Sequence, residues 1–237
     1  LRTAASPLVH WPTVAEPTAI LNVTDLSVRL GGVTIVEEVT FSLGSGDLAL
    51  LIGPNGAGKS TLLRSLVGLL PSGGDVEIAG RDPASLEARA SFVFVPDEPA
   101  LYEDLTLTEH ARFTALIYQR PESEDRALAW LRTFGLEARL EEFPGTHSRG
   151  MRQKLSLALA LGLEMPLTLL DEPFNGLDVE AQELLADALM KRARSGGAVL
   201  LTGHQRELDS LLDAKVMELR EGHLTVRGSP ARQSAKR

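Results

Sequence analysis

The stretch that decides the fold is Gly53-Pro54-Asn55-Gly56-Ala57-Gly58-Lys59-Ser60-Thr61. It fits the pattern G-x-x-x-x-G-K-[ST], and it lies between an apolar run at 47–52, which predicts a buried strand, and a helical pattern at 59–70. Glycines allow backbone N–H groups to turn inward around phosphate oxygens, and the N-terminus of the following helix favours an anion. We therefore expect all nine residues to bind a nucleoside triphosphate, with Lys59 reaching the β- and γ-phosphates and Ser60 ligating Mg²⁺.

A second pair of candidate residues follows another buried strand. The apolar run 167–170 delivers Asp171 and Glu172 at its end. Adjacent carboxylates at a strand end point in different directions, so Asp171 can serve the magnesium ion while Glu172 polarises the attacking water. The segment 92–99 also carries a strand followed by Asp-Glu-Pro, but Pro96 separates that strand from its acids. We assign the chemistry to Asp171 and Glu172.

Outward from these motifs, the chain divides into an α/β part and a helical part. Alternating apolar and polar residues around the Gly31-Gly32 turn predict antiparallel strands. Residues 97–148 show helical periodicity with little strand character. Strands are expected at 20–28, 33–36, 39–43, 75–79, 91–95, 167–170 and 198–202, helices at 150–163 and 179–194, and a closing hairpin at 216–219 and 224–226.

Composition limits what the chain can be. It has 237 residues, a net charge of −8 and no cysteine. The negative charge disfavours electrostatic binding of nucleic acid or anionic lipid over a broad surface. The lack of cysteine excludes disulfides, thiolate metal sites and cysteine nucleophiles. No apolar run is long enough to cross a bilayer. Residues 1–18 are expected to form a flexible arm rather than a signal peptide, and 229–237 a flexible basic tail.

Further motifs name a family. The run Thr146-His147-Ser148-Arg149-Gly150-Met151-Arg152-Gln153 resembles the signature Leu-Ser-Gly-Gly-Gln of the nucleotide-binding subunits of ATP-binding cassette (ABC) transporters. His147, Ser148, Arg149, Gly150 and Met151 occupy its five positions, and only Ser148 and Gly150, at the serine and the second glycine, match. The run Asn175-Gly176-Leu177-Asp178 resembles the loop that links the two ATP sites of the family's dimer. The resemblance extends from residue 19 to about 228.

The resemblance implies a fold and a set of roles. The fold is α/β: a P-loop NTPase core with an N-terminal antiparallel β subdomain and a helical subdomain of about 97–150 inserted into one ATPase domain, 19–228. The catalytic residues are Glu172, Lys59 and a switch histidine, His204. Residues implied to contact the ATP held by an opposing subunit are Ser148, Arg149, Gly150, Met151 and Asp178.

Two positions depart from the family pattern. Asp97 stands where the family usually has a glutamine that senses Mg²⁺ and the attacking water, and we assign it to the metal site with Ser60 and Asp171. An ionised aspartate cannot donate a hydrogen bond as glutamine does. Leu30 stands where an aromatic residue usually stacks on adenine. We keep Leu30 as an ATP-binding residue and expect weak recognition of the base.

The resulting hypothesis is an ATP-hydrolysing subunit with ATP and Mg²⁺ as cofactors. It would dimerise head-to-tail on ATP, as a homodimer or heterodimer, and power a separate membrane permease, with export favoured by the segment after Asp97. It would then lie in the cytoplasm, held at the membrane through the permease. Two alternatives remain: a soluble ABC ATPase acting on nucleic acid or ribosomes, against which the acidic charge argues, and a regulatory ABC subunit that binds ATP without hydrolysing it.

Overall fold

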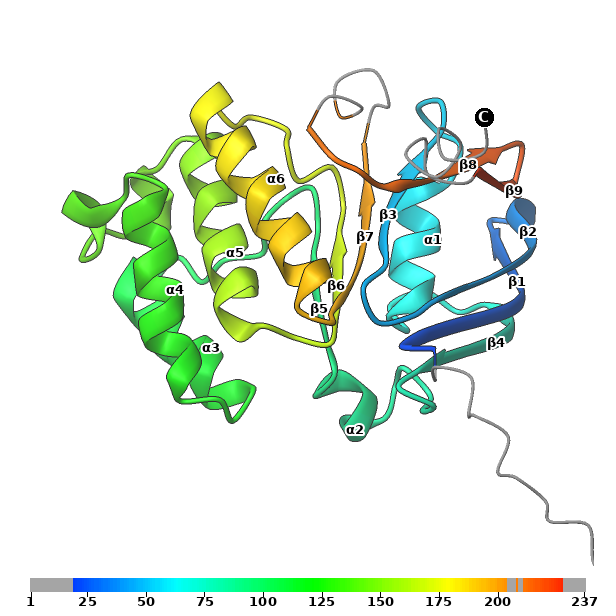
Figure 1. The fold of residues 1–237 in the computed structure, drawn as a ribbon, viewed down its shortest axis with the longest axis horizontal. Coiled ribbons are helices and arrows are strands. Elements are labelled where there is room, and N and C mark those ends of the chain that lie inside the picture. The colour runs from blue at the N-terminus through cyan, green and yellow to red at the C-terminus, as the bar shows by residue number, and fades with distance from the viewer. Residues whose placement is uncertain (1–18, 204–207, 209–210, 228–237) are drawn as a thin grey trace, which may run out of the picture.

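The computed structural model describes residues 19–203, 208 and 211–227. They form two sheets and a set of helices, arranged as in Figure 1. The large sheet has the strand order β5-β6-β7-β3-β8-β9, with parallel neighbours except in the β8–β9 hairpin. Its strands are β3 (Leu48–Ile52), β5 (Phe92–Val95), β6 (Leu167–Leu170), β7 (Ala198–Thr202), β8 (Lys215–Arg220) and β9 (His223–Arg227).

The small sheet is antiparallel, with the order β2-β1-β4. Its strands are β1 (Leu21–Leu30), β2 (Val33–Leu43) and β4 (Gly73–Ile78). The turn between β1 and β2 is the predicted Gly31-Gly32 pair, at φ 56° and 83°, which glycine adopts without strain. The two strands predicted at 33–36 and 39–43 are one strand. It contains a bulge. Between two paired positions, the stretch from Leu26 to Val28 in β1 faces the stretch from Val36 to Val39 in β2, which is one residue longer.

Helices cover both faces of the large sheet. In Figure 1, α1 lies between the two sheets, α5 and α6 lie on the other side, and α3 and α4 are outermost. The described segment between β5 and β6 contains helices and no strand, as its sequence predicts. The helices are α1 (Lys59–Leu66), α2 (Leu86–Arg89), α3 (Leu107–Ile117), α4 (Glu122–Thr133), α5 (Arg149–Leu163) and α6 (Val179–Arg194), with 3-10 turns η1 (Glu137–Arg139) and η2 (Pro144–Thr146).

Side chains on the two faces of the large sheet pack into two separate apolar cores. In β3, Leu48, Leu50 and Ile52 belong to the core shared with α5 and α6, while Ala49 and Leu51 belong to the core shared with α1 and the small sheet. This alternation follows from the period of a strand, and burial of both faces explains why the strand is apolar throughout. The architecture confirms the predicted α/β fold class.

Helix α1 ends at Leu66, earlier than the predicted end at Leu70. Gly68 adopts φ 72°, its N–H donates to the carbonyl of Ser65 at 3.0 Å, and the N–H of Leu69 donates to the carbonyl of Arg64 at 2.8 Å. This pattern closes a helix with a left-handed glycine. The termination signal is therefore Gly68, not the proline and glycines that follow.

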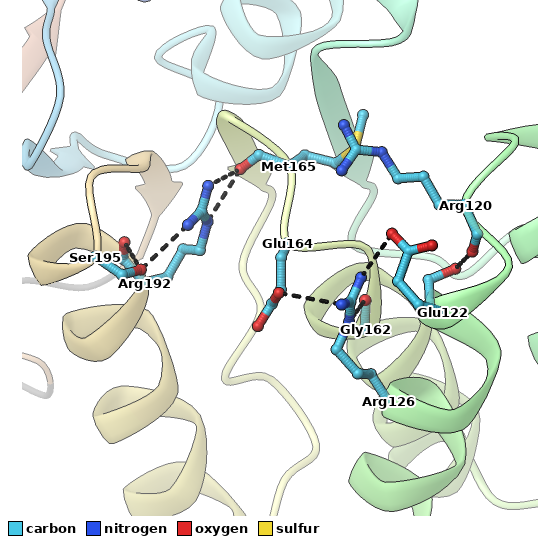
Figure 2. Close-up of polar contacts among 9 residues, drawn as sticks. Arg120, Glu122, Arg126, Gly162, Glu164, Met165, Arg192 and Ser195 are labelled. Atoms are coloured by element: carbon cyan, nitrogen blue, oxygen red, sulfur yellow. Dashed lines mark hydrogen bonds and ion pairs between the residues drawn. The ribbon is translucent and has the colours of Figure 1, made fainter.

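The C-terminal end of α5 is held by arginines from two other helices (Figure 2). Arg126 of α4 donates through Nε to the carbonyl of Gly162 at 2.7 Å, and Arg192 of α6 donates through Nη2 to the carbonyl of Met165 at 2.7 Å. Glu164 ends the helix at φ 51° and pairs with Arg126 at 3.4 Å. Cationic donors at a helix C-terminus satisfy carbonyls that lack partners within the helix.

Five parallel strands end at one edge of the large sheet. The register places Val95 beside Leu170, Leu170 beside Leu201, and Thr202 beside Leu51. The loops that follow β5, β6 and β3 therefore emerge together, and open α/β sheets bind ligands at this edge. No helix within the described residues is both long enough and apolar enough to span a membrane. The predicted boundaries at 1–18 and 229–237 lie outside the described residues.

Candidate functional site

The phosphate loop runs from the end of β3 to the start of α1. Its two most constrained glycines are Gly53 and Gly58. A Cβ on Gly53 would lie 2.4 Å from the carbonyl oxygen of Leu219, and one on Gly58 would lie 2.9 Å from Cγ2 of Ile35. Gly58 also adopts φ 99° at the N-cap of α1. Backbone from β8 and a side chain from β2 thus leave no room for larger residues, and the N–H of Ala57 donates to the carbonyl of Pro54 at 3.1 Å, which tightens the loop that leads into the N-terminus of α1.

Lys59 crosses the loop that precedes it. Its side chain is only 7% exposed, and Nζ donates to the carbonyl of Gly53 at 3.0 Å and lies 3.6 Å from Oε1 of Glu172. The ammonium group therefore lies between the phosphate loop and the end of β6. A cation held there by its own loop and by one carboxylate is placed to bind phosphate oxygens.

Asp171, Glu172 and Thr202 form one hydrogen-bonded unit at the ends of β6 and β7. The hydroxyl of Thr202 donates to Oδ1 of Asp171 at 2.8 Å and accepts from the backbone N–H of Glu172 at 2.7 Å. Glu172 has φ 47°, a conformation that costs a non-glycine residue free energy. Thr202 thus fixes both acids, and sequence reasoning missed it. Its signal was a lone polar residue ending the run Ala198–Thr202.

The site fits a magnesium ion bound together with a nucleotide. Oδ2 of Asp171 is buried and has no hydrogen-bond partner among the described residues, and a cation would satisfy it. No cluster of three or more His, Cys, Asp or Glu suited to a metal occurs in the described part of the chain. Mg²⁺ commonly combines one or two carboxylates with waters and phosphate oxygens, so Asp171 and the Ser60 hydroxyl are a sufficient protein contribution.

The turn that begins α5 packs on the loop after β6. Ser148 is the N-cap, and its Oγ accepts from the N–H of Met151 at 3.3 Å. A Cβ on Gly150 would lie 2.4 Å from the carbonyl oxygen of Gly176, so only glycine allows this approach. Gln153, buried in α5, donates to the carbonyl of Pro173 at 3.3 Å. The predicted signature and the predicted linking loop are therefore in direct contact.

Asp178 caps the next helix, α6. Its Oδ1 accepts from the N–H of Ala181 at 2.9 Å, and its Oδ2 accepts from Nζ of Lys154 in α5 at 2.6 Å. These bonds, the one from Lys154 first, hold the pKa of the Asp178 carboxyl below its usual value. Lys154 is a second residue that sequence reasoning did not single out. It lies one helical turn after Gly150, on the side of α5 that faces the loop.

Three other predicted site residues have different surroundings. Asp97 follows β5 and pairs with Arg149 at 3.1 Å, so it joins the signature turn. Leu30 ends β1 and is 39% exposed, while Ile35 of β2 is the residue that touches Gly58. His204 lies outside the described residues. The metal role of Asp97, the base contact of Leu30 and the switch role of His204 remain predictions.

Comparisons with known proteins agree on one family. The family model described as ABC transporter matches residues 36–175. The chain is 36% identical over 226 residues to the ABC-type transporter ATP-binding protein EcsA of Bacillus subtilis, covering 89% of this chain and 87% of EcsA. It is 34% identical over 192 residues to the SkfA peptide export ATP-binding protein SkfE of the same organism, covering 80% of each.

A solved structure agrees in fold and in sequence. The structure of an ATP-binding subunit of an ABC transporter superposes with a TM-score of 0.83 at 36% identity, covering 91% of this chain and 93% of that chain. Further relatives include ATP-binding proteins of both import and export systems. The similarity therefore extends over nearly the whole chain and includes both directions of transport.

Proposed function

Because the chain belongs to the ATP-binding subunits of ABC transporters, we propose that it drives transport by closing head-to-tail on ATP with a second ATP-binding subunit. The chain is an ATPase subunit of a transporter. The proposal rests on one observation: the phosphate loop lies beside the acids that follow β6, with Nζ of Lys59 3.6 Å from Oε1 of Glu172.

Each residue at this edge has a proposed part in hydrolysis. Loop N–H groups and Lys59 bind the phosphates, and Glu172 polarises the water that attacks the γ-phosphorus. Ser60 and Asp171 would hold Mg²⁺, which when bound neutralises charge on the β- and γ-phosphates, whereas the metal role of Asp97 stays a prediction from the sequence. Thr202 keeps Asp171 and Glu172 in place through the two bonds described above. His204 is proposed as the switch that contacts the γ-phosphate.

The second ATP contact is proposed to come from the opposing subunit. Ser148, Arg149, Gly150 and Met151 begin α5, where backbone N–H groups lack helical partners and favour an anion. Asp178 begins α6 beside them. Two copies, or this chain and a related subunit, would each present this turn to the other's phosphate loop. Leu30 is proposed to contribute an apolar contact to the base.

The transport partner is proposed to be a separate membrane permease. Between the core and the helical insertion lies a cavity of about 740 Å³, with the exposed apolar residues Leu69, Leu86 and Ile117 in its lining. Exposed apolar surface in a groove favours a protein partner, and this groove touches α2, β5 and the end of α3. We assign it to a cytoplasmic segment of the permease, which would hold this chain at the membrane. The name of SkfE supports export.

Glu172→Gln tests the proposal. The amide keeps the size of the side chain but loses the charge that polarises water, so we expect turnover to fall by about 100-fold or more with ATP binding retained. The ATP-bound dimer should then accumulate, as measured by sedimentation with ATP and Mg²⁺. The control is Glu183→Gln, a neutralised acid exposed on α6. Turnover near that of the parent protein would remove Glu172 from the catalytic role.

A further inference from the structure

One carboxylate oxygen joins three segments that are distant in the sequence. Oδ1 of Asp97, which follows β5, accepts from Nη2 of Arg149 at 3.1 Å and from Nδ2 of Asn175 at 3.4 Å. Arg149 is the first residue of α5, and Asn175 belongs to the loop between β6 and α6. Among the described residues, no donor reaches the second oxygen of Asp97. The shared oxygen is therefore occupied by protein groups.

The two segments joined by Asp97 also touch each other without it. Gly150 lies so close to the carbonyl of Gly176 that a Cβ would approach it to 2.4 Å. Lys154 bonds to Asp178 at 2.6 Å further along the same contact. The turn at 148–150 and the loop at 175–178 are therefore packed together as one unit. Asp97 adds a further contact between these two segments and the end of β5 in the large sheet.

We propose that Asp97 is a positioning residue that acts through Arg149 and Asn175. Its charge fixes the turn at 148–150 and the loop at 175–178 relative to β5, in the arrangement that a second copy meets. The part concerning a second copy rests on the proposed function. The fastening itself rests on the contacts alone. A magnesium contact by Asp97, as predicted from the sequence, would have to use its second oxygen.

The chemistry of the contact explains why a charge matters there. A carboxylate accepts from a guanidinium in a charge-assisted bond, which is stronger than a bond to a neutral amide oxygen. The side chains of Arg149 and Asp97 are 62% and 37% exposed, so the pair adds little to overall stability. Its effect is local, because it restricts one turn and one loop. Loss of the charge should loosen those segments and leave the rest of the fold unchanged.

Amide hydrogen exchange, measured on the nucleotide-free full chain, tests whether Asp97 holds the turn and the loop in place. Asp97→Asn should speed amide exchange at 150–153 and 174–178 by about two- to fivefold, the range expected for an exposed ion pair. The matched control is Glu98→Gln, which neutralises the adjacent exposed acid. Arg149→Gln should give the same increase, and the double variant no more than either alone. Unchanged exchange in both segments, or equal changes in the control, would overturn the proposal.

A second measurement separates positioning from metal binding. In the Glu172→Gln background, Asp97→Asn should raise the ATP concentration needed for dimer formation about two- to fivefold, with the ATP affinity of the monomer and the Mg²⁺ requirement unchanged. A raised Mg²⁺ requirement with unchanged exchange would make Asp97 a metal ligand and overturn positioning. If Glu172→Gln itself forms no dimer, the proposed dimer fails, while the exchange result still decides the role of Asp97.

Discussion

Helix α5 is held differently at its two ends. At the N-terminal end, Arg149 reaches Asp97 through an exposed ion pair of 3.1 Å. At the C-terminal end, Arg126 and Arg192 donate to main-chain carbonyls, and a Cβ on Gly162 would lie 2.7 Å from the backbone nitrogen of Ala127. Figure 2 shows this second end, where arginines from α4 and α6 converge.

This difference suggests that one end of α5 stabilises the domain, while the contacts at the other end can rearrange. Hydrogen bonds to main-chain carbonyls and close helix packing are costly to break, whereas exposed side-chain pairs exchange partners at low cost. The C-terminal end of α5 should therefore contribute to the stability of the whole domain. The N-terminal end, which carries the turn proposed to meet a second subunit, should contribute mainly to binding. The predictions below test this division.

The largest effect is expected from Gly162→Ala. The added methyl meets main-chain atoms of Ala127 at 2.7–2.9 Å, so α4 and α5 must separate. Overpacking costs about 1–3 kcal/mol and offsets a gain of about 1 kcal/mol in helix propensity; because the methyl meets main chain, we expect the upper part of that range. The melting temperature should fall by about 2–6 °C. The same change at the other end, Gly150→Ala, places the methyl 2.4 Å from the carbonyl oxygen of Gly176, which is closer still, but Gly176 lies in an exposed loop that can shift, so the melting temperature should fall by less than about 2 °C. Equal losses at the two ends would contradict the division.

A smaller effect is expected from Arg192→Met. The substitution removes the Nε and Nη2 bonds to the carbonyl of Met165, of 3.0 and 2.7 Å, together with the Nη1 bond to Oγ of Ser195 of 3.1 Å, and keeps the apolar length of the side chain. The lost bonds should cost about 1 kcal/mol, or about 2–4 °C in melting temperature. Arg194→Met is the matched control, since Arg194 is exposed on the same helix. A melting temperature equal to that of the control would show that Arg192 does not stabilise the end of α5.

The sequence predicted elements whose signals are local. Helix α6 and strands β6 and β7 begin and end at the predicted residues, because caps and apolar runs mark both ends. The phosphate loop is likewise a contiguous pattern. The contacts of Asp97 were not predicted, since its partners lie 52 and 78 residues away and only the fold brings them together. The same holds for Arg192, whose carbonyl partner follows a different helix.

The site shows the same limit. Asp171 and Glu172 could be named because acids at the end of a buried strand are unusual, but the role of Thr202 depends on the pairing of β6 with β7. The bulge in β2 was interpreted as a gap between two strands, because one extra residue shifts the alternating pattern by one position, so that the buried residues Val36 and Val39 lie three residues apart. Contacts between segments thus need the topology, while the chemistry within a segment does not.

The smallest effect concerns acid sensitivity at the N-terminal half of α5. The pKa of Asp178 lies below its ordinary value of 3.8, because the charged form accepts from Lys154 and from a backbone N–H. A depressed pKa contributes stability that is present above pH 3.8 and is lost as the pH falls through the folded-state value. The arginine bonds to the carbonyls of Gly162 and Met165 involve no carboxylate, so this contribution of Asp178 belongs to the N-terminal half of α5.

Asp178→Asn isolates this effect. Asparagine remains a good N-cap for α6, so the variant loses the charge opposite Lys154 and little else. At pH 7 the parent protein should be more stable than the variant by less than about 1 kcal/mol, as for other exposed pairs. The difference should shrink towards zero as the pH is lowered below 3.8, when the parent carboxyl takes up its proton. Thermal unfolding of both proteins across this range measures it. A difference independent of pH would mean that the shape of the Asp178 side chain, rather than its charge, holds the two helices together.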